Sequence, residues 1–198
     1  MGGGDIFMKR HGWKKVAAAL FAVFYMSGAF AQSTELIELC VTGVRGACRE
    51  TGKYFRQENR LDVAAHFYRR ACDLGDVNSC GVLAYFYIEG IGVQQSYRVA
   101  ANLLRKACDS GLDAGCNSLG VLYEKGQDVP QSYLAAAHLY RKSCDLGNVA
   151  SCYSLGNFFM EGLGVSLSEV HAKEFYARAC KLGSEDGCKE YARVNKGN

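Results

Sequence analysis

The chain has 198 residues, of which 49% are hydrophobic and 22% are charged, and its formal net charge is +3. Residues 1–31 hold four of its 23 Lys and Arg and one of its 20 Asp and Glu, so residues 32–198 carry 19 charges of each sign. A balanced chain of this kind has no charge excess that would favour nucleic acid or an acidic membrane surface.

The first 31 residues have the pattern of a secretory signal peptide. A basic region at 9–15 precedes an apolar run at 16–26, and Ala29-Phe30-Ala31 is a small-x-small cleavage site. The apolar run is too short to cross a bilayer, so no stable membrane anchor is expected after cleavage. The sequence therefore predicts a secreted or periplasmic bacterial protein.

Ten cysteines divide the rest of the chain into repeats. They form five pairs, each with a sequence separation of eight: Cys40 and Cys48, Cys72 and Cys80, Cys108 and Cys116, Cys144 and Cys152, and Cys180 and Cys188. The last four pairs recur every 36 residues, and a fixed period of this size is typical of a solenoid of stacked helix pairs.

We therefore predict an all-α fold, an α/α superhelical solenoid of helix pairs, as a single domain over residues 32–198. Its predicted repeats lie at about 40–71, 72–107, 108–143 and 144–179, followed by a C-terminal cap at 180–198.

The first helix of each repeat is expected to begin near the second cysteine of the pair. Four residues after that cysteine stands a small residue, and seven after it an aromatic one. The small residues are Gly52, Ala84, Gly120 and Gly156, and the aromatic residues are Phe55, Tyr87, Tyr123 and Phe159. This spacing predicts a helix whose backbone lies close to a neighbouring helix. Glycine-containing turns at 89–93, 125–129 and 161–165 are expected to end these helices, and the first repeat lacks such a turn.

The second helix of each repeat is expected to end at the first cysteine of the next pair. A glycine three residues later can take the left-handed conformation that closes a helix. These glycines are Gly75, Gly111, Gly147 and Gly183. Cation pairs such as Arg69-Arg70 and Arg105-Lys106 precede the cysteines, and we interpret them as cations that complement the helix dipole.

The two cysteines of a pair thus lie on either side of a short bend between two helices. A disulfide needs Cα atoms about 4.4 to 6.8 Å apart, whereas equivalent cysteines of successive repeats would be roughly 8 to 10 Å apart. We therefore predict five local disulfides, one within each pair. Zinc binding is the competing interpretation, but zinc sites favour shorter spacings, and an exported chain meets an oxidising compartment.

The repeats resemble a known family. The stretches CNSLGVLYEKGQDVPQSYLAAAHLYRKSC and CYSLGNFFMEGLGVSLSEVHAKEFYARAC are similar to Sel-like repeats, which are relatives of the tetratricopeptide repeat. With the paired cysteines and the signal peptide, the chain resembles the Helicobacter cysteine-rich protein family. The resemblance implies a superhelix with one bridge at each helix junction. It also implies penicillin binding with weak β-lactamase activity, or a secreted protein that acts on host cells.

The sequence itself shows no catalytic motif. No serine is followed three residues later by lysine, and neither Ser-Asp-Asn nor Lys-Thr-Gly occurs. The histidines after the leader are His66, His138 and His171, and they form no metal-binding motif. We therefore expect no metal and no cofactor, and a β-lactamase activity would rest on the resemblance alone.

A binding surface has a better physical basis, because superhelices of this kind present a concave face. If the tetratricopeptide geometry applies, this face carries the positions one and five after the second cysteine. They are Arg49, Lys53, Gly81, Tyr85, Asn117, Val121, Tyr153, Asn157, Lys189 and Arg193. Cationic ends, tyrosines and amides would suit an extended peptide, although these residues would also be unremarkable on a solvated surface.

The sequence thus predicts a secreted or periplasmic scaffold for a protein, a peptide or a peptidoglycan fragment. The alternative is a weak β-lactamase or penicillin-binding protein that takes β-lactams.

Overall fold

The computed structural model describes residues 34–196, so the predicted signal peptide lies outside the described part. All regular secondary structure in this part is helical. A helical segment at 34–41 precedes α2 (Arg45–Gln57), α3 (Leu61–Asp73), α4 (Val77–Glu89), α5 (Tyr97–Asp109), α6 (Asp113–Lys125), α7 (Tyr133–Asp145), α8 (Val149–Glu161), α9 (Glu169–Lys181) and α10 (Glu185–Lys196). The predicted all-α fold is confirmed.

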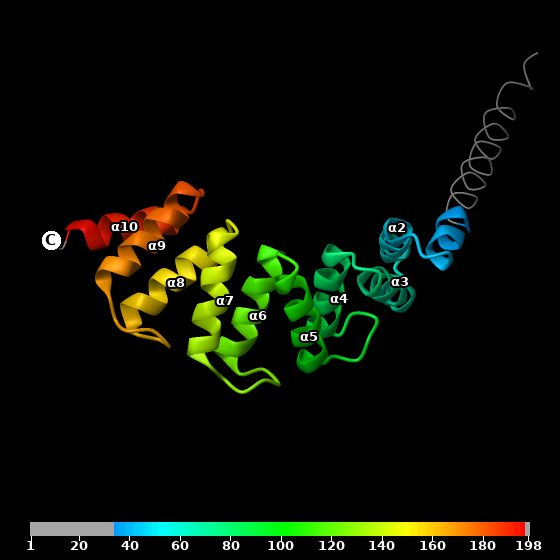
Figure 1. Cartoon of the computed structure of the whole chain (residues 1–198), viewed down its shortest axis with the longest axis horizontal. Coiled ribbons are helices and arrows are strands. Elements are labelled where there is room, and N and C mark those ends of the chain that lie inside the picture. Colours follow the sequence, from blue (N-terminus) through cyan, green and yellow to red (C-terminus); the bar gives the residue numbers. More distant parts are fainter. Residues whose placement is uncertain (1–33, 197–198) are drawn as a thin grey trace, which may run out of the picture.

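The helices stack in chain order along an arc, and each packs against the helix before it and the helix after it (Figure 1). Even-numbered helices are the first helices of the repeats, and odd-numbered helices are the second. The turns at 90–96, 126–132 and 162–168 lie along the lower edge of the arc in Figure 1. We call this edge, defined by the three turns, the turn edge.

Local sequence explains where the helices begin and end. The hydroxyl groups of Ser96, Ser132 and Ser168 accept hydrogen bonds from backbone N–H groups in the first turns of α5, α7 and α9. Gly90 ends α4 with a φ of 70°, in the left-handed region that glycine enters without strain.

Five disulfides close the bends between repeats, in the pairing that the eight-residue spacing predicts. Their Cα–Cα distances are 4.5 to 4.7 Å. Cys40 through Cys152 are at most 1% exposed, so these sulfur atoms belong to the core. No cysteine of the described residues is left free.

Each helix pair packs through a match of large and small residues. A Cβ atom at Gly156 would lie 2.5 Å from the ring of Tyr176, and one at Gly120 would lie 2.8 Å from the ring of Tyr140. In the second full repeat, the corresponding residues are Ala84 and Leu104. Glycine therefore stands where a tyrosine ring crosses the first helix, and alanine where the smaller leucine does.

The cations near the helix ends join neighbouring repeats. Lys106 Nζ donates to the backbone oxygen of Cys72 (2.7 Å), and Arg178 Nη2 donates to that of Cys144 (3.2 Å). They complement a helix C-terminus, as expected from the sequence, but it is the C-terminus of the preceding repeat's helix. The first cation of a pair contacts the following repeat instead. Arg105 Nη2 donates to the hydroxyl of Tyr123 on α6 (2.8 Å).

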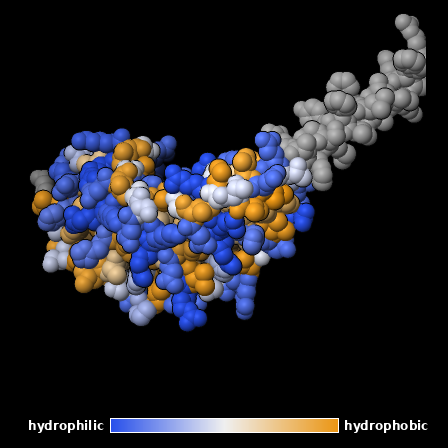
Figure 2. Space-filling model, turned by 45° about the vertical axis from the view of Figure 1, so that its right-hand side comes forward, coloured by the Kyte–Doolittle hydropathy of each residue, from blue (hydrophilic) through white to orange (hydrophobic). Residues whose placement is uncertain are grey.

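The molecular surface carries both hydrophobic and hydrophilic residues. Figure 2 shows several separate groups of hydrophobic residues among hydrophilic ones. No helix within residues 34–196 has the length and apolar character to cross a membrane.

Candidate interaction surface on the first helices

The residues predicted for the concave face all lie on the first helices, α2, α4, α6, α8 and α10. They are half-buried or exposed, and they fall into two rows. We call the positions one after the second cysteine the junction row: Arg49, Gly81, Asn117, Tyr153 and Lys189. We call the positions five after it the open row: Lys53, Tyr85, Val121, Asn157 and Arg193.

Three residues of the junction row contact the beginning of the next repeat's first helix. Arg49 Nη1 forms an ion pair with Asp76 Oδ2 (2.7 Å), and a Cβ atom at Gly81 would lie 3.1 Å from Leu112 Cδ2. Asn117 accepts a hydrogen bond from Ser151, near the start of the next repeat's first helix. These residues therefore contribute to the stacking of repeats, a role that the sequence analysis missed.

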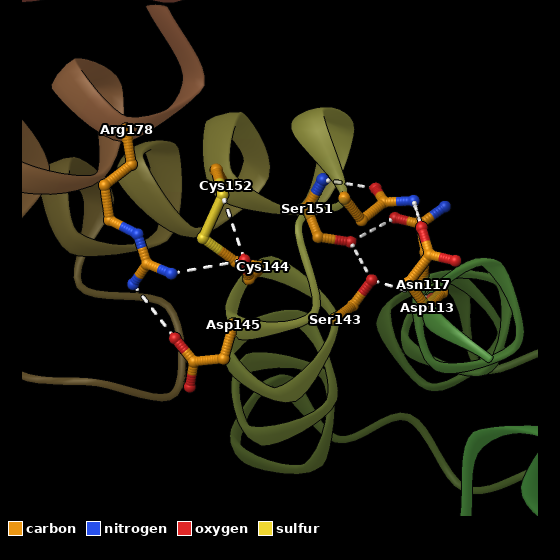
Figure 3. The surroundings of a disulfide bond; sticks show 9 residues. Asp113, Asn117, Ser143, Cys144, Asp145, Ser151, Cys152 and Arg178 are labelled. Atoms are coloured by element: carbon orange, nitrogen blue, oxygen red, sulfur yellow. Dashed lines mark hydrogen bonds and ion pairs between the residues drawn. A yellow bond between two sulfur atoms is a disulfide. The ribbon is translucent and has the colours of Figure 1, made fainter. Parts of the chain in front are cut away.

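Figure 3 shows the junction at Asn117. Ser151 Oγ donates to Asn117 Oδ1 (2.7 Å) and lies 2.8 Å from Ser143 Oγ, which donates to the backbone oxygen of Asp113 (2.8 Å). Asn148 caps α8 by accepting from Ser151 N, and its amide donates to Asp113 Oδ2 (2.9 Å). Because its oxygen faces Ser151, the amide of Asn117 has a fixed orientation.

At the first junction, a carboxylate takes the place of this amide cap. Asp76 Oδ1 accepts from Ser79 N (2.8 Å) while Oδ2 pairs with Arg49. Burial alone would raise the pKa of Asp76, but the hydrogen bond from the backbone N–H of Ser79 and the charge of Arg49 outweigh it, so this pKa lies below its usual value. Asp76 thus stays ionised and holds Arg49 in the junction.

The open row is more accessible. Tyr85 is 54% exposed near the middle of the stack. Val121 and Asn157 are half-buried, and Asn157 Oδ1 accepts a hydrogen bond from the hydroxyl of Tyr176 (2.7 Å). The open row therefore combines an exposed aromatic ring with an oriented amide.

The cations at both ends of the two rows lie in ion pairs with nearby carboxylates. Lys53 pairs with Glu50 (2.9 Å). At the other end, Arg193 pairs with Glu190 (2.7 Å), and Lys189 with Asp186 (3.1 Å). The cationic ends expected from the sequence are therefore largely neutralised, and a carboxylate ligand would have to compete with these partners.

Buried tyrosine hydroxyls reach this face from the second helices. Tyr140 donates to Glu124, and burial together with this carboxylate raises the pKa of Tyr140. Burial and the negative charge of Glu190 raise the pKa of Tyr176 to about 12. The sequence analysis missed these hydroxyls. The sequence feature that could have predicted them is the tyrosine on the second helix of each repeat whose first helix carries a glycine.

The three histidines of the described part lie apart on the second helices, and all are exposed. His171 stacks on Phe159, with the ring centroids 5.0 Å apart, and its Nδ1 lies 2.8 Å from Ser168 Oγ. No group of three or more His, Cys, Asp or Glu within residues 34–196 is arranged to hold a metal ion. A β-lactamase activity still rests on the family resemblance, and nitrocefin turnover by the oxidised protein would test it.

The fold and these junctions define an α/α solenoid protein whose consecutive helix pairs are joined by disulfides. The model of the Sel1 repeat family matches residues 46–76, 79–112, 113–148 and 149–184, so the chain belongs to the Sel1 repeat family. The predicted family resemblance is confirmed. No curated protein matches the sequence.

Solved structures agree with this assignment. The SLR-fold protective antigen c5321 of uropathogenic Escherichia coli is similar, with a TM-score of 0.74 at 29% identity over 79% of this chain and 34% of its own. A Sel1 repeat protein from Oxalobacter formigenes shares the fold, with a TM-score of 0.70 at 19% identity over 82% of this chain and 66% of its own.

Helicobacter pylori cysteine rich protein B is also similar, with a TM-score of 0.50 at 32% identity over 64% of this chain and 90% of its own. This chain thus spans about a third of the Escherichia coli protein and about two thirds of the Oxalobacter protein.

Proposed function

We propose that this protein is a secreted or periplasmic scaffold that holds a protein or peptide partner on the open row of its first helices. The scaffold is a single solenoid domain over residues 32–198 that follows a signal peptide at 1–31. Five disulfides support an oxidising compartment, because such bonds are rare where thiols are kept reduced. Sel1 repeats generally mediate protein interactions, which supports a binding role.

The exposure of Tyr85 is the observation that carries this proposal. Tyr85 is 54% exposed, although tyrosine is a residue that contributes strongly to protein interfaces. Along the same face lie the oriented amides of Asn117 and Asn157, held by Ser151 and Tyr176. Groups held in place before binding lose little entropy on binding.

An extended peptide suits this arrangement. Its backbone N–H and C=O groups can pair with side-chain amides, and one of its apolar side chains can cover Tyr85. A peptide of peptidoglycan belongs to the same chemical class, since it offers backbone amides and a terminal carboxylate.

Photocrosslinking from a residue of the open row tests the proposal. A photoreactive phenylalanine analogue replaces Tyr85, the protein is exposed to periplasmic extract, and crosslinked partners are identified by mass spectrometry. Tyr133 is the matched control, since it is an exposed tyrosine on the second helix α7. The proposal predicts a partner captured from position 85 and not from position 133.

Affinity for the captured partner is then measured. Tyr85→Ala should weaken binding at least tenfold, the loss usual for an aromatic residue at the centre of an interface, and Tyr133→Ala should leave it unchanged. Equal capture from both positions, or full affinity in Tyr85→Ala, would reject the open row as the binding surface.

A further inference from the structure

Two of the three turns of the turn edge pack closely on a neighbouring helix through their second glycine. A Cβ atom at Gly92 would lie 2.3 Å from the backbone of Leu61, and one at Gly164 would lie 2.2 Å from the backbone of Tyr133. Both glycines have a φ of 64°. Each of these two turns therefore lies directly on the start of the preceding repeat's second helix, α3 or α7, in a space that admits only glycine.

The middle turn departs from this packing at two adjacent positions. Asp128, with a φ of 50°, occupies the position of Gly92 and Gly164. Gln127 occupies the position of Ile91, which packs against the core in its own turn. A side chain cannot enter the space that the glycines fill in the other two turns, so Asp128 cannot pack on the start of α5 as Gly92 and Gly164 pack on α3 and α7.

Two hollows lie beside the start of α5, and Asp128 of the middle turn lines one of them. One, of about 320 Å³, is lined by Ser96, Arg98 and Asp128. The other, of about 550 Å³, shares Ser96 and Arg98 and extends over Tyr87, Gln94 and Val99. Together they flank the start of α5, and they have the size of sites that hold small ligands or a few residues of a peptide.

The first hollow contains two opposite charges that are not paired. Arg98 and Asp128 are both exposed and line the same space. Within residues 34–196, no ion pair joins them to each other or to any other side chain. Both charges are therefore available to an occupant.

We propose that this junction is a second binding groove, separate from the open row, for an extended peptide segment that carries one acidic and one basic side chain. The acidic side chain pairs with Arg98, and the basic one with Asp128. The amide of Gln94 is placed to bond the peptide backbone, and Val99 and Tyr87 offer apolar contact in the adjoining hollow. Ser96 and Asp128, which line the first hollow, belong to two of the three turns that define the turn edge.

Amide chemical shifts of the isotope-labelled, oxidised protein test this proposal, because they detect weak binding. The probes are capped peptides of glycine and serine with one Asp and one Lys, separated by two, three or four residues. A peptide with Asn and Gln in their place is the neutral control. At least one charged peptide should shift the resonances of residues 93–99 and 126–129, and the shifts should shrink with added salt.

The repeats themselves supply the test variants. Arg98→Leu introduces the residue that stands at the equivalent position, Leu134, and Asp128→Gly introduces the residue of the other two turns. Each should weaken peptide binding at least fivefold while keeping the thermal melt of the parent. Tyr85→Ala changes only the open row and should bind the peptides normally.

Three results would overturn the groove. They are an absence of shifts at residues 93–99 and 126–129 with every charged peptide, equal shifts with the neutral peptide, and undiminished shifts in Asp128→Gly. Because Tyr85→Ala is measured alongside, failure of this groove and failure of the open row are distinguished.

Discussion

Ser79 and Ser151 occupy the same position in two repeats, and both are fully buried. Ser151 contacts Asn117 and Ser143, whereas Ser79 Oγ has no hydrogen-bond partner within the described part of the chain. The difference follows from two neighbours. Ala71 stands where the later repeat has Ser143, and Arg49, which has no acceptor, stands where it has Asn117. The same residue is thus satisfied in one repeat and unsatisfied in another.

This pair predicts opposite effects of one substitution. Ser151→Ala should lower the free energy of unfolding by about 1 to 2 kcal/mol, because Asn117 and Ser143 lose a buried partner. Ser79→Ala should keep or raise stability, because it removes a buried polar group that lacks a partner. Urea unfolding of the two variants measures the contrast. Equal destabilisation by both would show that the hydroxyl contacts of Ser151 contribute nothing.

At the residue scale, the sequence also predicted the binding surface only in part. Lys53 and Arg193 were expected as cationic ends, but each lies beside a glutamate three residues away on the same helix. That pairing can be read from the sequence, since residues three apart on a helix are neighbours. The pairing of Arg49 with Asp76 cannot be read from the sequence, because the two residues lie in different repeats.

At the scale of the helix pair, the match of Gly156 with Tyr176 sets how closely the two helices approach. The sequence indicated the small residues of the first helices, but it did not show which side chain each one meets. In the structure, the partner ring passes over the missing Cβ atom and places its hydroxyl beside Asn157. Close packing and the orientation of an amide on the open row therefore depend on the same glycine.

Gly156→Ala should destabilise the protein by about 1 to 3 kcal/mol, because the added methyl group would overlap the ring of Tyr176. Tyr176→Leu should restore part of this loss in the double variant, since Ala84 with Leu104 is the pairing of another repeat. A double-mutant cycle from thermal melts measures this coupling.

Gly46→Ala is the control for the helix pair. Gly46 lies in the first turn of α2 with no atom within 4 Å of an added Cβ, so alanine should be neutral or stabilising there. Additive effects of Gly156→Ala and Tyr176→Leu would contradict the size match.

At the scale of the whole molecule, the disulfides hold together a stack in which each repeat contacts only its neighbours. A ring of about nine residues contributes roughly 2.5 kcal/mol in the loop-entropy relation, so five bridges sum to the order of 10 kcal/mol as an upper figure. Domain stabilities are typically about 5 to 15 kcal/mol. The bridges are therefore comparable to the net stability, and the fully reduced protein should melt far below the oxidised one.

The bridges should also differ in how easily they are reduced. Cys180 and Cys188 are both half-buried, whereas the cysteines of the other four pairs are at most 1% exposed. Access of a thiolate governs exchange, so the bridge between α9 and α10 should be reduced first under mild reductant. Alkylation followed by peptide mapping gives the order. Reduction of an interior bridge before this one would contradict the burial argument.

The features that were read correctly from the sequence are local. The 36-residue period, the glycine turns and the pairing of cysteines eight apart all depend on residues within one bend or one helix. Chain geometry over so few residues leaves little choice, so spacing alone sufficed to predict the helix pairs and their bridges.

The contacts between repeats required the folded structure. Ser151 bonds to Asn117 across 34 residues, and Arg98 of α5 and Asp128 of the middle turn come to line one hollow. These contacts depend on the rotation and translation from one repeat to the next. That geometry is set by the packing of whole helix faces and is not encoded by any short motif. For that reason the sequence predicted a binding face on the first helices, whereas the groove beside α5 could be identified only from the folded structure.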